Sequence, residues 1–385
     1  MDKKPEKLVP EVRFKGFTDD WEQHKLGEIS FKVNTKNKEN LTLPVLSNSA
    51  EYGIVNQEDY FDKKIANRTD NYYIVKHNDF VYNPRISKKA PYGPIRRNTL
   101  DTKGLMSPLY YVFRINDGNY IYLDYYFKSS KWYKFMYQNG DSGARSDRFA
   151  IKDKIFQMMP ISMPNTKEQN KIGQLIQTLQ KLIDLQQRKL NQLKRLKTAM
   201  LQQLFTDKNS KQPNLRFKNF RGDWEQRKLK SVVSVNSGKD YKSLEKGNVP
   251  VYGTGGYITS VSKFLSSQDA IGLGRKGTIN KPYILKAPFW TVDTLFYLTL
   301  KPENILTFIY SLIQKINWLQ YDESTGLPSL SKKNIENVLV SLTKLDEQQK
   351  IGKVIVKLDK FITLQQSKID QLTILKKYLL QKLFI

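Results

Sequence analysis

The sequence contains no cysteine and only two histidines, His24 and His77, among its 385 residues. Without cysteine the chain cannot form disulfides, use a thiol in catalysis or build a cysteine-ligated zinc site. Two histidines are too few for the common histidine-ligated metal centres, and both read as ordinary surface or turn residues. The sequence therefore predicts that the chain itself binds no metal or other cofactor.

Long apolar runs are also absent from the sequence. No stretch of about 18 apolar residues is present, and residues 1–14 lack the apolar segment of a signal peptide. We therefore expect a cytoplasmic protein.

Negative charge is scarce in this chain. Asp and Glu number 37 against 64 Lys and Arg, which gives a net charge of +27 at pH 7. A surplus of this size exceeds what solubility needs and attracts polyanions to the surface. A membrane surface would attract the same charge, but the missing apolar segments leave nucleic acid as the leading partner.

The chain does contain an internal repeat. Residues 10–26 return as residues 213–229, an offset of 203, and residues 168–205 return as residues 347–384, an offset of 179. Because the second offset is smaller, the stretch between the repeated blocks is shorter in the second copy. The pattern predicts two similar halves that share a constant frame and carry different inserts.

The second repeated block predicts a long amphipathic helix in each half. Apolar residues recur at intervals of three, four and seven, in a stripe that Gln186 and Gln365 interrupt at the same place. Such a helix is not stable alone. Since each helix follows its own module, we expect the two to pack antiparallel about a pseudo-two-fold axis. The residues expected in this packing are Ile172, Leu179, Leu182, Leu193, Ile351, Leu358, Phe361 and Leu372.

Between the repeated blocks the sequence predicts two mixed α/β modules, so the fold class is α+β. Residues 27–163 and 230–342 alternate short β-rich runs with turn signals. Each module also contains one apolar segment with helical spacing, at 120–137 and at 305–319. Two pairs of strand segments align between the modules, 80–85 with 270–275 and 107–110 with 293–296. We therefore expect one fold with two different surfaces.

Taken together, these features resemble the specificity subunit of type I restriction-modification systems. The segments that carry the resemblance are 20–26, 223–229, 249–258, 271–279, 324–338 and the Glu-Gln-x-Lys-Ile-Gly start of both long helices. They lie in both halves, so the resemblance covers almost the whole chain. The first module departs from the pattern at residues 143–148, where the second has residues 326–330.

The resemblance implies an architecture and a set of partners. It implies a first target recognition domain at 1–163, a spacer helix at 164–206, a linker at 207–212, a second target recognition domain at 213–342 and a spacer helix at 343–385. Each domain would read one half of a split, asymmetric double-stranded DNA sequence. The chain would be non-catalytic and would recruit bacterial partners. These are two adenine methyltransferase subunits and restriction or translocase subunits, which use S-adenosylmethionine, ATP and Mg²⁺.

Cations near turns and neighbouring polar residues are the candidate DNA contacts. Arginine beside glycine can approach a phosphate or a guanine edge closely, although a solvated basic surface is the alternative for each cation. The candidates in the first module are Arg85, Lys88, Lys89, Tyr92, Arg96, Arg97, Arg145 and Arg148, and those in the second are Tyr252, Thr254, Arg275, Lys276 and Lys281.

Three further features favour structural roles. Asn83-Pro84-Arg85-Ile86 lacks the second proline and the aromatic residue of an adenine methyltransferase loop, so it predicts a turn. Residues 272–278 lack the Gly-Lys-Ser/Thr sequence of a phosphate-binding loop. The repeated tryptophans should be structural anchors or partner contacts, and Trp132, Tyr133 and Tyr137 favour a core over a base-stacking surface.

Two other classes of function stay open at this point. One is a DNA-modifying enzyme with its own active site, against which the missing methyltransferase and NTPase motifs argue. The other is a free-standing DNA-binding regulator or scaffold that acts as a homodimer, which would read a palindromic site. A sequence-specific, non-catalytic recognition subunit is the interpretation that the repeat and the charge favour.

Overall fold

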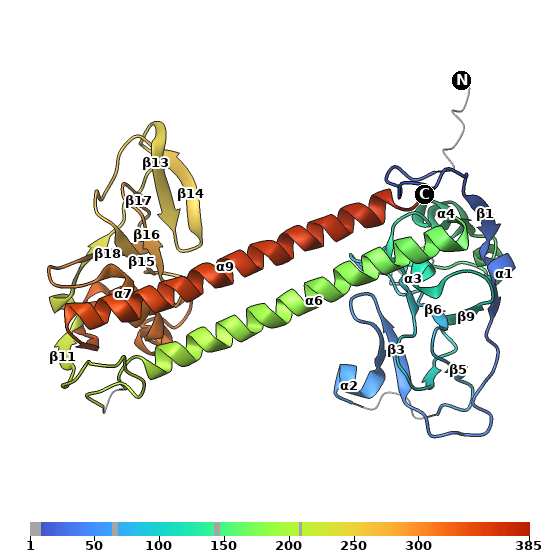
Figure 1. The fold of residues 1–385 in the computed structure, drawn as a ribbon, viewed down its shortest axis with the longest axis horizontal. Helices are drawn as coiled ribbons and strands as arrows, with labels where there is room; N and C mark the ends of the chain where they lie inside the picture. The colour runs from blue at the N-terminus through green and yellow to red at the C-terminus, as the bar shows by residue number, and fades with distance from the viewer. Residues whose placement is uncertain (1–8, 64–67, 142–146, 208–209) are drawn as a thin grey trace. The chain divides into compact units, whose positions relative to one another are not determined.

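The computed structural model describes residues 9–63, 68–141, 147–207 and 210–385. The chain divides into two compact units (Figure 1). Unit 1 comprises the residues up to Leu185 together with Ile369–Ile385, and unit 2 comprises Gln186–Lys368. The chain leaves unit 1 through helix α6 (Thr166–Gln203) and returns to it through helix α9 (Leu345–Lys382).

The described part of unit 1 contains a two-stranded ribbon and two four-stranded sheets. The ribbon pairs β1 with β10, and the sheets have the strand orders β2-β9-β6-β7 and β4-β3-β8-β5. The strands are β1 (Glu22–Lys25), β2 (Ser30–Lys32), β3 (Val45–Ser49), β4 (Gly53–Asn56), β5 (Tyr73–Val75), β6 (Phe80–Tyr82), β7 (Ile95–Arg97), β8 (Gly104–Met106), β9 (Tyr111–Ile115) and β10 (Pro160–Met163). The helices are α1 (Leu26–Ile29), α2 (Gln57–Phe61), α3 (Tyr120–Lys128), α4 (Tyr133–Asn139) and α5 (Asp153–Phe156).

The described part of unit 2 repeats this plan with one strand fewer. Its ribbon pairs β11 with β19, and its sheets have the orders β12-β18-β15-β16 and β14-β13-β17. The strands are β11 (Glu225–Lys228), β12 (Val233–Ser237), β13 (Lys246–Gly253), β14 (Gly256–Val261), β15 (Ala270–Gly274), β16 (Tyr283–Leu285), β17 (Trp290–Thr291), β18 (Leu295–Leu300) and β19 (Leu339–Leu342). The helices are η1 (Leu229–Ser231), α7 (Leu306–Lys315), η2 (Trp318–Tyr321) and α8 (Lys332–Asn337).

Strand register confirms the alignment of the two modules. In unit 1, Tyr82 of β6 pairs with Tyr111 of β9, and in unit 2 Gly272 of β15 pairs with Tyr297 of β18. These pairs are the ones that the sequence alignment matches. Strands β3 and β13 each add a hairpin partner on one side and a parallel strand on the other. The two inserts therefore share one α+β fold.

The repeated blocks form the same contacts in both units. Arg13 donates from its Nε to Glu168 Oε1 at 2.9 Å in unit 1, and Arg216 donates to Glu347 Oε1 at 2.8 Å in unit 2. The ribbon registers Glu22 to Met163 and Glu225 to Leu342 also coincide. We call these contacts the frame contacts. They explain why the segments that make them are repeated while the inserts differ.

In each long helix, the glutamine directly after the frame glutamate accepts a hydrogen bond at the start of a helix in the insert. The backbone N–H of Asn119 donates to Gln169 Oε1 at 2.9 Å, and that of Ile305 donates to Gln348 Oε1 at 3.1 Å. Asn119 and Ile305 are the N-cap residues of α3 and α7. Because a free N–H at a helix start needs an acceptor, the Glu-Gln start of the long helices fixes the inserts in place.

The end of each long helix closes a core that lies far away in the sequence. Phe205, which follows α6, stacks on Phe308 of unit 2 at a ring-centroid distance of 5.1 Å. Phe384, which follows α9, contacts Tyr122 of unit 1 at 5.2 Å. Both phenylalanines are buried. The core of each unit therefore includes a phenylalanine from the end of a long helix, and in unit 1 this residue is far in sequence from the insert.

Helices α6 and α9 lie side by side within each unit, as the apolar stripe predicts. In unit 1, Lys376 donates to Gln180, and in unit 2, Gln365 Nε2 donates to Gln186 Oε1 at 2.6 Å. The two interrupting glutamines thus bond to each other, which gives the polar break in the stripe a partner. Phe361 differs from the other expected packing residues because it is 45% exposed. The others are buried or half-buried.

The segment 120–137 is two helices and not the single helix that the sequence predicted. Helix α3 ends where the Ser129 N–H bonds to Tyr125 and Tyr126, and α4 begins at Tyr133. The segment 305–319 is likewise divided into α7 and the start of η2. Serine side chains compete for backbone acceptors and so favour helix ends, a local effect that apolar spacing does not report.

The aromatic residues in this region differ in burial. Trp132 is buried and donates from Nε1 to the Phe127 carbonyl at 3.1 Å, as a core residue should. Tyr133 is half-buried, but Tyr137 is 74% exposed, so its assignment to the core was wrong. Trp21 and Trp224 are buried, which confirms them as structural anchors.

Candidate nucleic-acid interface

The turn after β6 places most of the cationic candidates of unit 1 on one surface. Asn83 begins the turn, because its Oδ1 accepts the Arg85 N–H at 2.9 Å and its Nδ2 donates to the Asn48 carbonyl. The chain itself reverses later, at Lys88 and Lys89, where Ser87 pairs with Ala90, so the turn predicted at Asn83-Pro84 lies a few residues further along. Arg85 then pairs through its backbone with Arg148 in an isolated antiparallel bridge. This bridge brings together cations that are 63 positions apart in the sequence.

These cations line a hollow of about 620 Å³, which we call the cationic hollow. Arg85, Lys88, Lys89 and Arg148 all contribute to its wall. The Arg85 side chain is 67% exposed and its Nη2 lies 3.5 Å from Asp147 Oδ2. Lys89 Nζ lies 2.7 Å from Glu51 Oε2. Surface pairs of this kind exchange readily for other anions, so the cations stay available to a phosphate.

Three other candidates of unit 1 bond within the unit. Arg96 donates to the Ala50 carbonyl at 2.8 Å, and burial lowers the pKa of its guanidinium. Arg97 donates to Asn78 Oδ1 at 2.6 Å and lies 3.8 Å from buried Asp124. Tyr92 contacts the rings of Tyr133 and Phe149, both at 5.2 Å. These contacts favour structural roles. Arg145 lies outside the described residues.

In unit 2 the equivalent turn carries Arg275 and Lys276. The Arg275 N–H donates to the Thr294 carbonyl at 2.8 Å, and its guanidinium Cζ lies 5.7 Å from the Phe296 ring centroid, over the ring. Its Nη1 reaches the Asp293 carbonyl at 3.5 Å. The side chain is thus guided by a ring and a carbonyl but has no carboxylate partner among the described residues. Lys276 is exposed.

The bridge after the turn corrects one detail of the sequence alignment. The isolated pair equivalent to Arg85 and Arg148 joins Lys276 to Ser329. The Phe149 N–H donates to the Pro84 carbonyl, and the Leu330 N–H donates to the Arg275 carbonyl. Arg85 is therefore equivalent to Lys276 and not to Arg275, because the two turns differ by one residue after the strand.

A loop held by Asp322 lies against this turn. The Asp322 carboxylate accepts the Ser329 N–H at 2.8 Å and the Ser324 N–H at 3.0 Å, and these bonds hold its pKa below the usual range. The Gly277 N–H donates to the Pro328 carbonyl. The sequence pattern points to the 326–330 segment but not to Asp322, because a lone aspartate gives no signal before its partners are known.

Two of the remaining candidates of unit 2, Tyr252 and Thr254, lie at the end of β13, and Lys281 lies just before β16. The Tyr252 carbonyl accepts the Val292 N–H at 3.0 Å, two residues before the Thr294 carbonyl that binds Arg275. Tyr283 Oη donates to the Gly253 carbonyl at 2.6 Å. Thr254 is half-buried and Lys281 is exposed. Backbone contacts through residues 292–294 thus bring Tyr252 close to Arg275.

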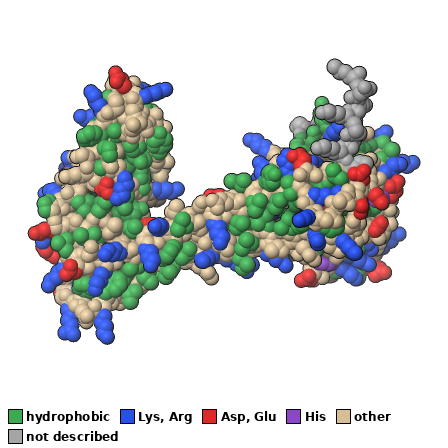
Figure 2. Space-filling view, turned by 45° about the horizontal axis from the view of Figure 1, so that its top comes forward, with side chains coloured by type: hydrophobic (Ala, Val, Ile, Leu, Met, Phe, Trp, Pro, Cys, Tyr) green, Lys and Arg blue, Asp and Glu red, His purple; other side chains and the backbone are tan. Residues whose placement is uncertain are grey.

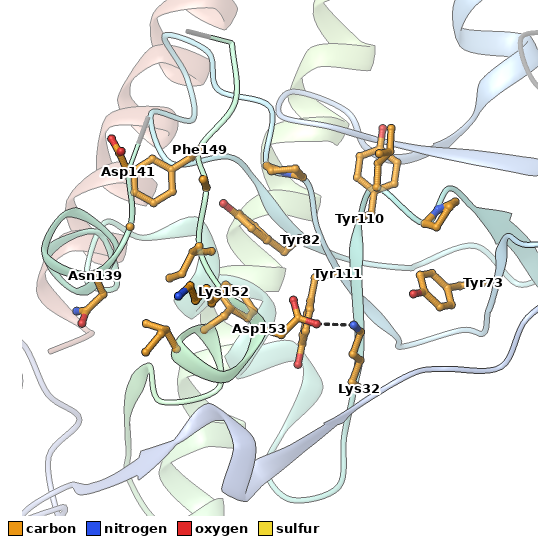
Figure 3. A pocket seen from close by; sticks show the side chains of 18 residues that line it. Lys32, Tyr73, Tyr82, Tyr110, Tyr111, Asn139, Asp141, Phe149, Lys152 and Asp153 are labelled. Carbon is orange, nitrogen blue, oxygen red and sulfur yellow. Dashed lines mark hydrogen bonds and ion pairs between the residues drawn. The ribbon is translucent and has the colours of Figure 1, made fainter. Parts of the chain in front are cut away.

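Unit 1 contains a second hollow, of about 830 Å³, which sequence analysis did not predict (Figure 3). We call it the aromatic hollow, since its wall includes Tyr73, Tyr82, Tyr110, Tyr111, Phe149 and Phe156. In Figure 3, Tyr82 and Tyr111 lie centrally, with Asn139 and Asp141 toward one side and Tyr110 and Tyr73 toward the other. Lys32 and Asp153 form an ion pair beside Tyr111. The rings come from three strands, a helix and the segments between them, so no single local motif in the sequence contains them.

The described residues offer little for metal or redox chemistry. Among them, no group of three or more His, Cys, Asp or Glu side chains could hold a metal ion. Within the same residues, no helix is both long enough and apolar enough to cross a membrane. On the face drawn in Figure 2, Lys and Arg side chains are scattered over both units and outnumber Asp and Glu.

Comparison with known proteins identifies the family. The model of the type I restriction modification DNA specificity domain matches residues 18–195 and again residues 221–373. These two matches include most of the chain, so the chain belongs to this family. It is a type I restriction-modification specificity subunit, a non-catalytic subunit that carries the DNA recognition domains of its system.

Individual relatives agree with this assignment. The type I restriction enzyme MjaVIII specificity subunit of Methanocaldococcus jannaschii is 30% identical over 121 residues, which are 31% of this chain and 26% of that protein. The match thus spans about a quarter of the length of this curated relative.

Solved structures show the fold. The S subunit of a type I restriction-modification system from M. genitalium has a TM-score of 0.64 at 18% identity, covering 98% of this chain and 99% of that one. A chain from a structure of the complex assembly and conformational transition of the type I R-M system has a TM-score of 0.56 at 13% identity. It covers 94% of this chain and 96% of that one. Two β-containing domains with long helices are therefore the fold of this chain and of these solved chains.

Proposed function

We propose that this chain reads a split, asymmetric double-stranded DNA sequence, with one half-site for each unit. The observation that carries the proposal is that the two units share the strand order of one sheet, but the turn after β6 in unit 1 carries different side chains from the turn after β15 in unit 2. Unit 1 presents Arg85 beside a cationic hollow, and unit 2 presents Arg275 over the ring of Phe296. Identical readers would select a palindrome. Readers with one frame and different side chains should select two different sequences.

The proposed DNA contacts are the candidates whose side chains remain accessible. In unit 1 these are Arg85, Lys88, Lys89 and Arg148, and in unit 2 they are Tyr252, Thr254, Arg275, Lys276 and Lys281. Exposed cations on turns suit phosphates and guanine edges. We propose the domain limits at 1–163 and 213–342, with 164–206 and 343–385 as spacer helices and 207–212 as the linker.

We further propose that the chain recruits catalytic partners and performs no reaction itself. The partners would be two adenine methyltransferase subunits and restriction or translocase subunits, which would supply the S-adenosylmethionine, ATP and Mg²⁺ chemistry. The name of the family, a restriction modification DNA specificity domain, supports the coarser statement that recognition and modification work together. The stoichiometry and the cofactors are part of the proposal.

A methylation map tests the bipartite target. DNA from cells that express this chain together with its methyltransferase should carry methyladenine in one split asymmetric sequence, and cells that lack either protein should not. A palindromic sequence, or methylation by the chain alone, would contradict the proposal. The first result would favour a homodimeric regulator, and the second would favour an enzyme with its own active site.

Substitution of Arg275 tests the assignment of one half-site to one unit. Arg275→Ala should weaken recognition of a single half-site by about 1–3 kcal/mol if the guanidinium contacts a base. Lys230→Ala is a matched control, since it removes one exposed cation of unit 2 outside the turn. Binding measured on DNA with each half-site randomised in turn separates the cases. Equal loss at both half-sites would argue against the assignment.

A further inference from the structure

The aromatic hollow adjoins the cationic hollow in unit 1. Pro84, Leu109 and Tyr110 belong to the walls of both hollows, so they form a ridge between them. Leu109 is 61% exposed on this ridge. A DNA strand whose phosphates lie against Arg85 and Lys88 would therefore pass beside the opening of the aromatic hollow. We call Pro84, Leu109 and Tyr110 the ridge below.

The chemistry of the aromatic hollow matches a nucleobase. Ring faces attract bases of every kind through stacking, and six of the eighteen residues that line this hollow are aromatic. Exposed Asn139 and Asp141 lie at one side, where they can bond to the edge of a base (Figure 3). The Lys32–Asp153 ion pair balances the two charges that lie nearest to Tyr111. A phosphate would find less here than in the cationic hollow, where the cations gather.

Unit 2 keeps a tyrosine, Tyr297, at the position of Tyr111 but differs from unit 1 at three other positions of this hollow. Strand register places Gly272 where unit 1 has Tyr82. The equivalent turn contacts place Leu330 where unit 1 has Phe149. The Arg275 guanidinium lies over Phe296, which is equivalent to Tyr110 on the ridge. Unit 2 therefore has no ring at the positions of Tyr82 and Phe149, and an arginine lies over the ring at the position of Tyr110.

We propose that unit 1 takes one unstacked DNA base into the aromatic hollow, and that unit 2 reads its half-site without such a step. The inference rests on the proposed function, because it requires unit 1 to contact one half-site. Unstacking a base has a free-energy cost that the rings must offset. The site is separate from catalysis, since it lies in a chain that performs no reaction.

Chemical probing of the bound DNA tests for the unstacked base. The full chain, in complex with its methyltransferase subunits, is bound to target DNA and treated with permanganate for thymine, diethyl pyrocarbonate for purines and hydroxylamine for cytosine. Unstacked bases react faster than stacked ones. We expect one hyperreactive base in the half-site of unit 1, apart from any adenine that the methyltransferases expose, and no counterpart in the half-site of unit 2.

The variant Tyr110→Leu connects the reactive base to the hollow. It removes a ring from the ridge but keeps an apolar side chain, and Tyr137→Leu is the control because Tyr137 is exposed outside the hollow. Tyr110→Leu should return the reactive base to the level of stacked DNA and weaken binding to that half-site by about 5- to 100-fold. Tyr137→Leu should change neither quantity.

The outcomes separate this inference from the function on which it rests. Specific binding of both half-sites without an additional reactive base would overturn the inference and leave the proposed function standing. A reactive base that persists in Tyr110→Leu would also overturn it. If the unmodified chain shows no preference for either half-site sequence, the proposed function itself is overturned. If Tyr110→Leu fails to fold, probing of the unmodified chain still tests the inference, because the absence of a reactive base in the half-site of unit 1 overturns it.

Discussion

Unit 1 and unit 2 hold equivalent ribbons against equivalent helices by different means. In unit 1, Tyr122 and Tyr126 of α3 donate their hydroxyls to the carbonyls of Ser162 at 2.8 Å and Pro160 at 3.2 Å. In unit 2, Phe308 and Leu312 of α7 take these places, as the parallel contacts of Tyr122 with Phe384 and Phe308 with Phe205 show.

This difference separates two levels of constraint. The frame contacts made by Arg13 and Arg216 are the same in both units, because they involve buried carboxylates that must stay paired. The contact of α3 or α7 with its ribbon needs only apolar side chains that pack together, and the tyrosine hydroxyl bonds of unit 1 add a modest contribution. The two units therefore share the contacts whose loss by a single substitution would strongly lower the stability of the unit. Four experiments test that view.

The first and largest expected effect concerns the residues that close each core. Phe384→Ala should destabilise unit 1 by about 3–5 kcal/mol and leave unit 2 unchanged, whereas Phe205→Ala should do the reverse. The reason is that each ring is buried in the unit that its helix reaches last. Hydrogen exchange resolved by peptide measures the two units separately. Loss of protection in the other unit would contradict the assignment.

The second experiment removes the cation of each frame contact. Arg13→Met should destabilise unit 1 by about 3–5 kcal/mol, because it leaves a buried carboxylate unpaired. Arg216→Met should cost less in unit 2, since Thr343 Oγ1 also donates to Glu347. Among the described residues, no second side chain is seen to donate to Glu168.

Urea unfolding of both variants measures these losses. The double variant Arg13→Met with Glu168→Gln serves as the control, because it removes the stranded charge and should recover part of the stability. Equal losses in unit 1 and unit 2 would show that the Thr343 hydroxyl contributes nothing.

The third experiment compares Gly173 and Gly352, which lie about two turns after the starts of the two long helices. A Cβ on Gly352 would lie 2.3 Å from Thr307 Oγ1 and 2.7 Å from the Phe308 nitrogen. A Cβ on Gly173 would lie 3.2 Å from Ile121 Cγ2 and 3.3 Å from the Tyr122 nitrogen. We expect Gly352→Ala to cost about 1–3 kcal/mol through overpacking.

Gly173→Ala is the matched variant, and its cost should be smaller. The neighbouring side chain can move slightly, and alanine favours a helix over glycine by about 1 kcal/mol. Thermal unfolding of both variants gives the ranking. A greater loss in Gly173→Ala would mean that unit 1 packs its helix more tightly than unit 2 does.

The smallest effect concerns the loop of unit 2 that hydrogen bonds to Asp322 hold in place. The pKa of Asp322 is lowered by hydrogen bonds from Ser329 and Ser324, so the folded loop favours the carboxylate. That contribution is present at pH values above the ordinary aspartate pKa of about 3.9. It is lost as the pH falls through the lowered value. Hydrogen exchange of residues 324–330 should therefore rise only below that range.

Asp322→Asn is the corresponding variant at neutral pH. It keeps one acceptor oxygen but removes the charge, so the loop should loosen slightly and binding of one half-site should weaken slightly. The matched change Asp240→Asn, at an exposed position elsewhere in unit 2, should leave both measurements unchanged. An identical pH profile in Asp322→Asn and the unmodified chain would exclude the carboxylate as the cause.

Much of the frame could be predicted from the sequence. The repeat gave the two long helices to within a few residues, because their apolar stripe extends over many turns. The module alignment was right within the strands, where register pairs residues one to one. It failed by one residue after the strand, since a turn can absorb an insertion without any change in hydrophobic pattern.

The candidate site was harder to predict. Charge density pointed to Arg85 and Arg275, but it pointed equally to Arg96 and Arg97, whose partners Ala50 and Asn78 are not adjacent to them in the sequence. The aromatic hollow escaped notice because its rings come from distant strands and turns. A cluster of cations can be found in the sequence, whereas a hollow lined by rings from distant segments exists only in the folded chain.

The closure of unit 1 by Leu383 and Phe384 has a consequence for biosynthesis. All residues of unit 2 are translated before these two, although most of unit 1 is translated first. Domains usually fold in the order in which they leave the ribosome. In this chain the aromatic core of unit 1 stays incomplete until unit 2 has been translated. We therefore expect unit 1 to be the part of the nascent chain that is most susceptible to proteolysis and aggregation.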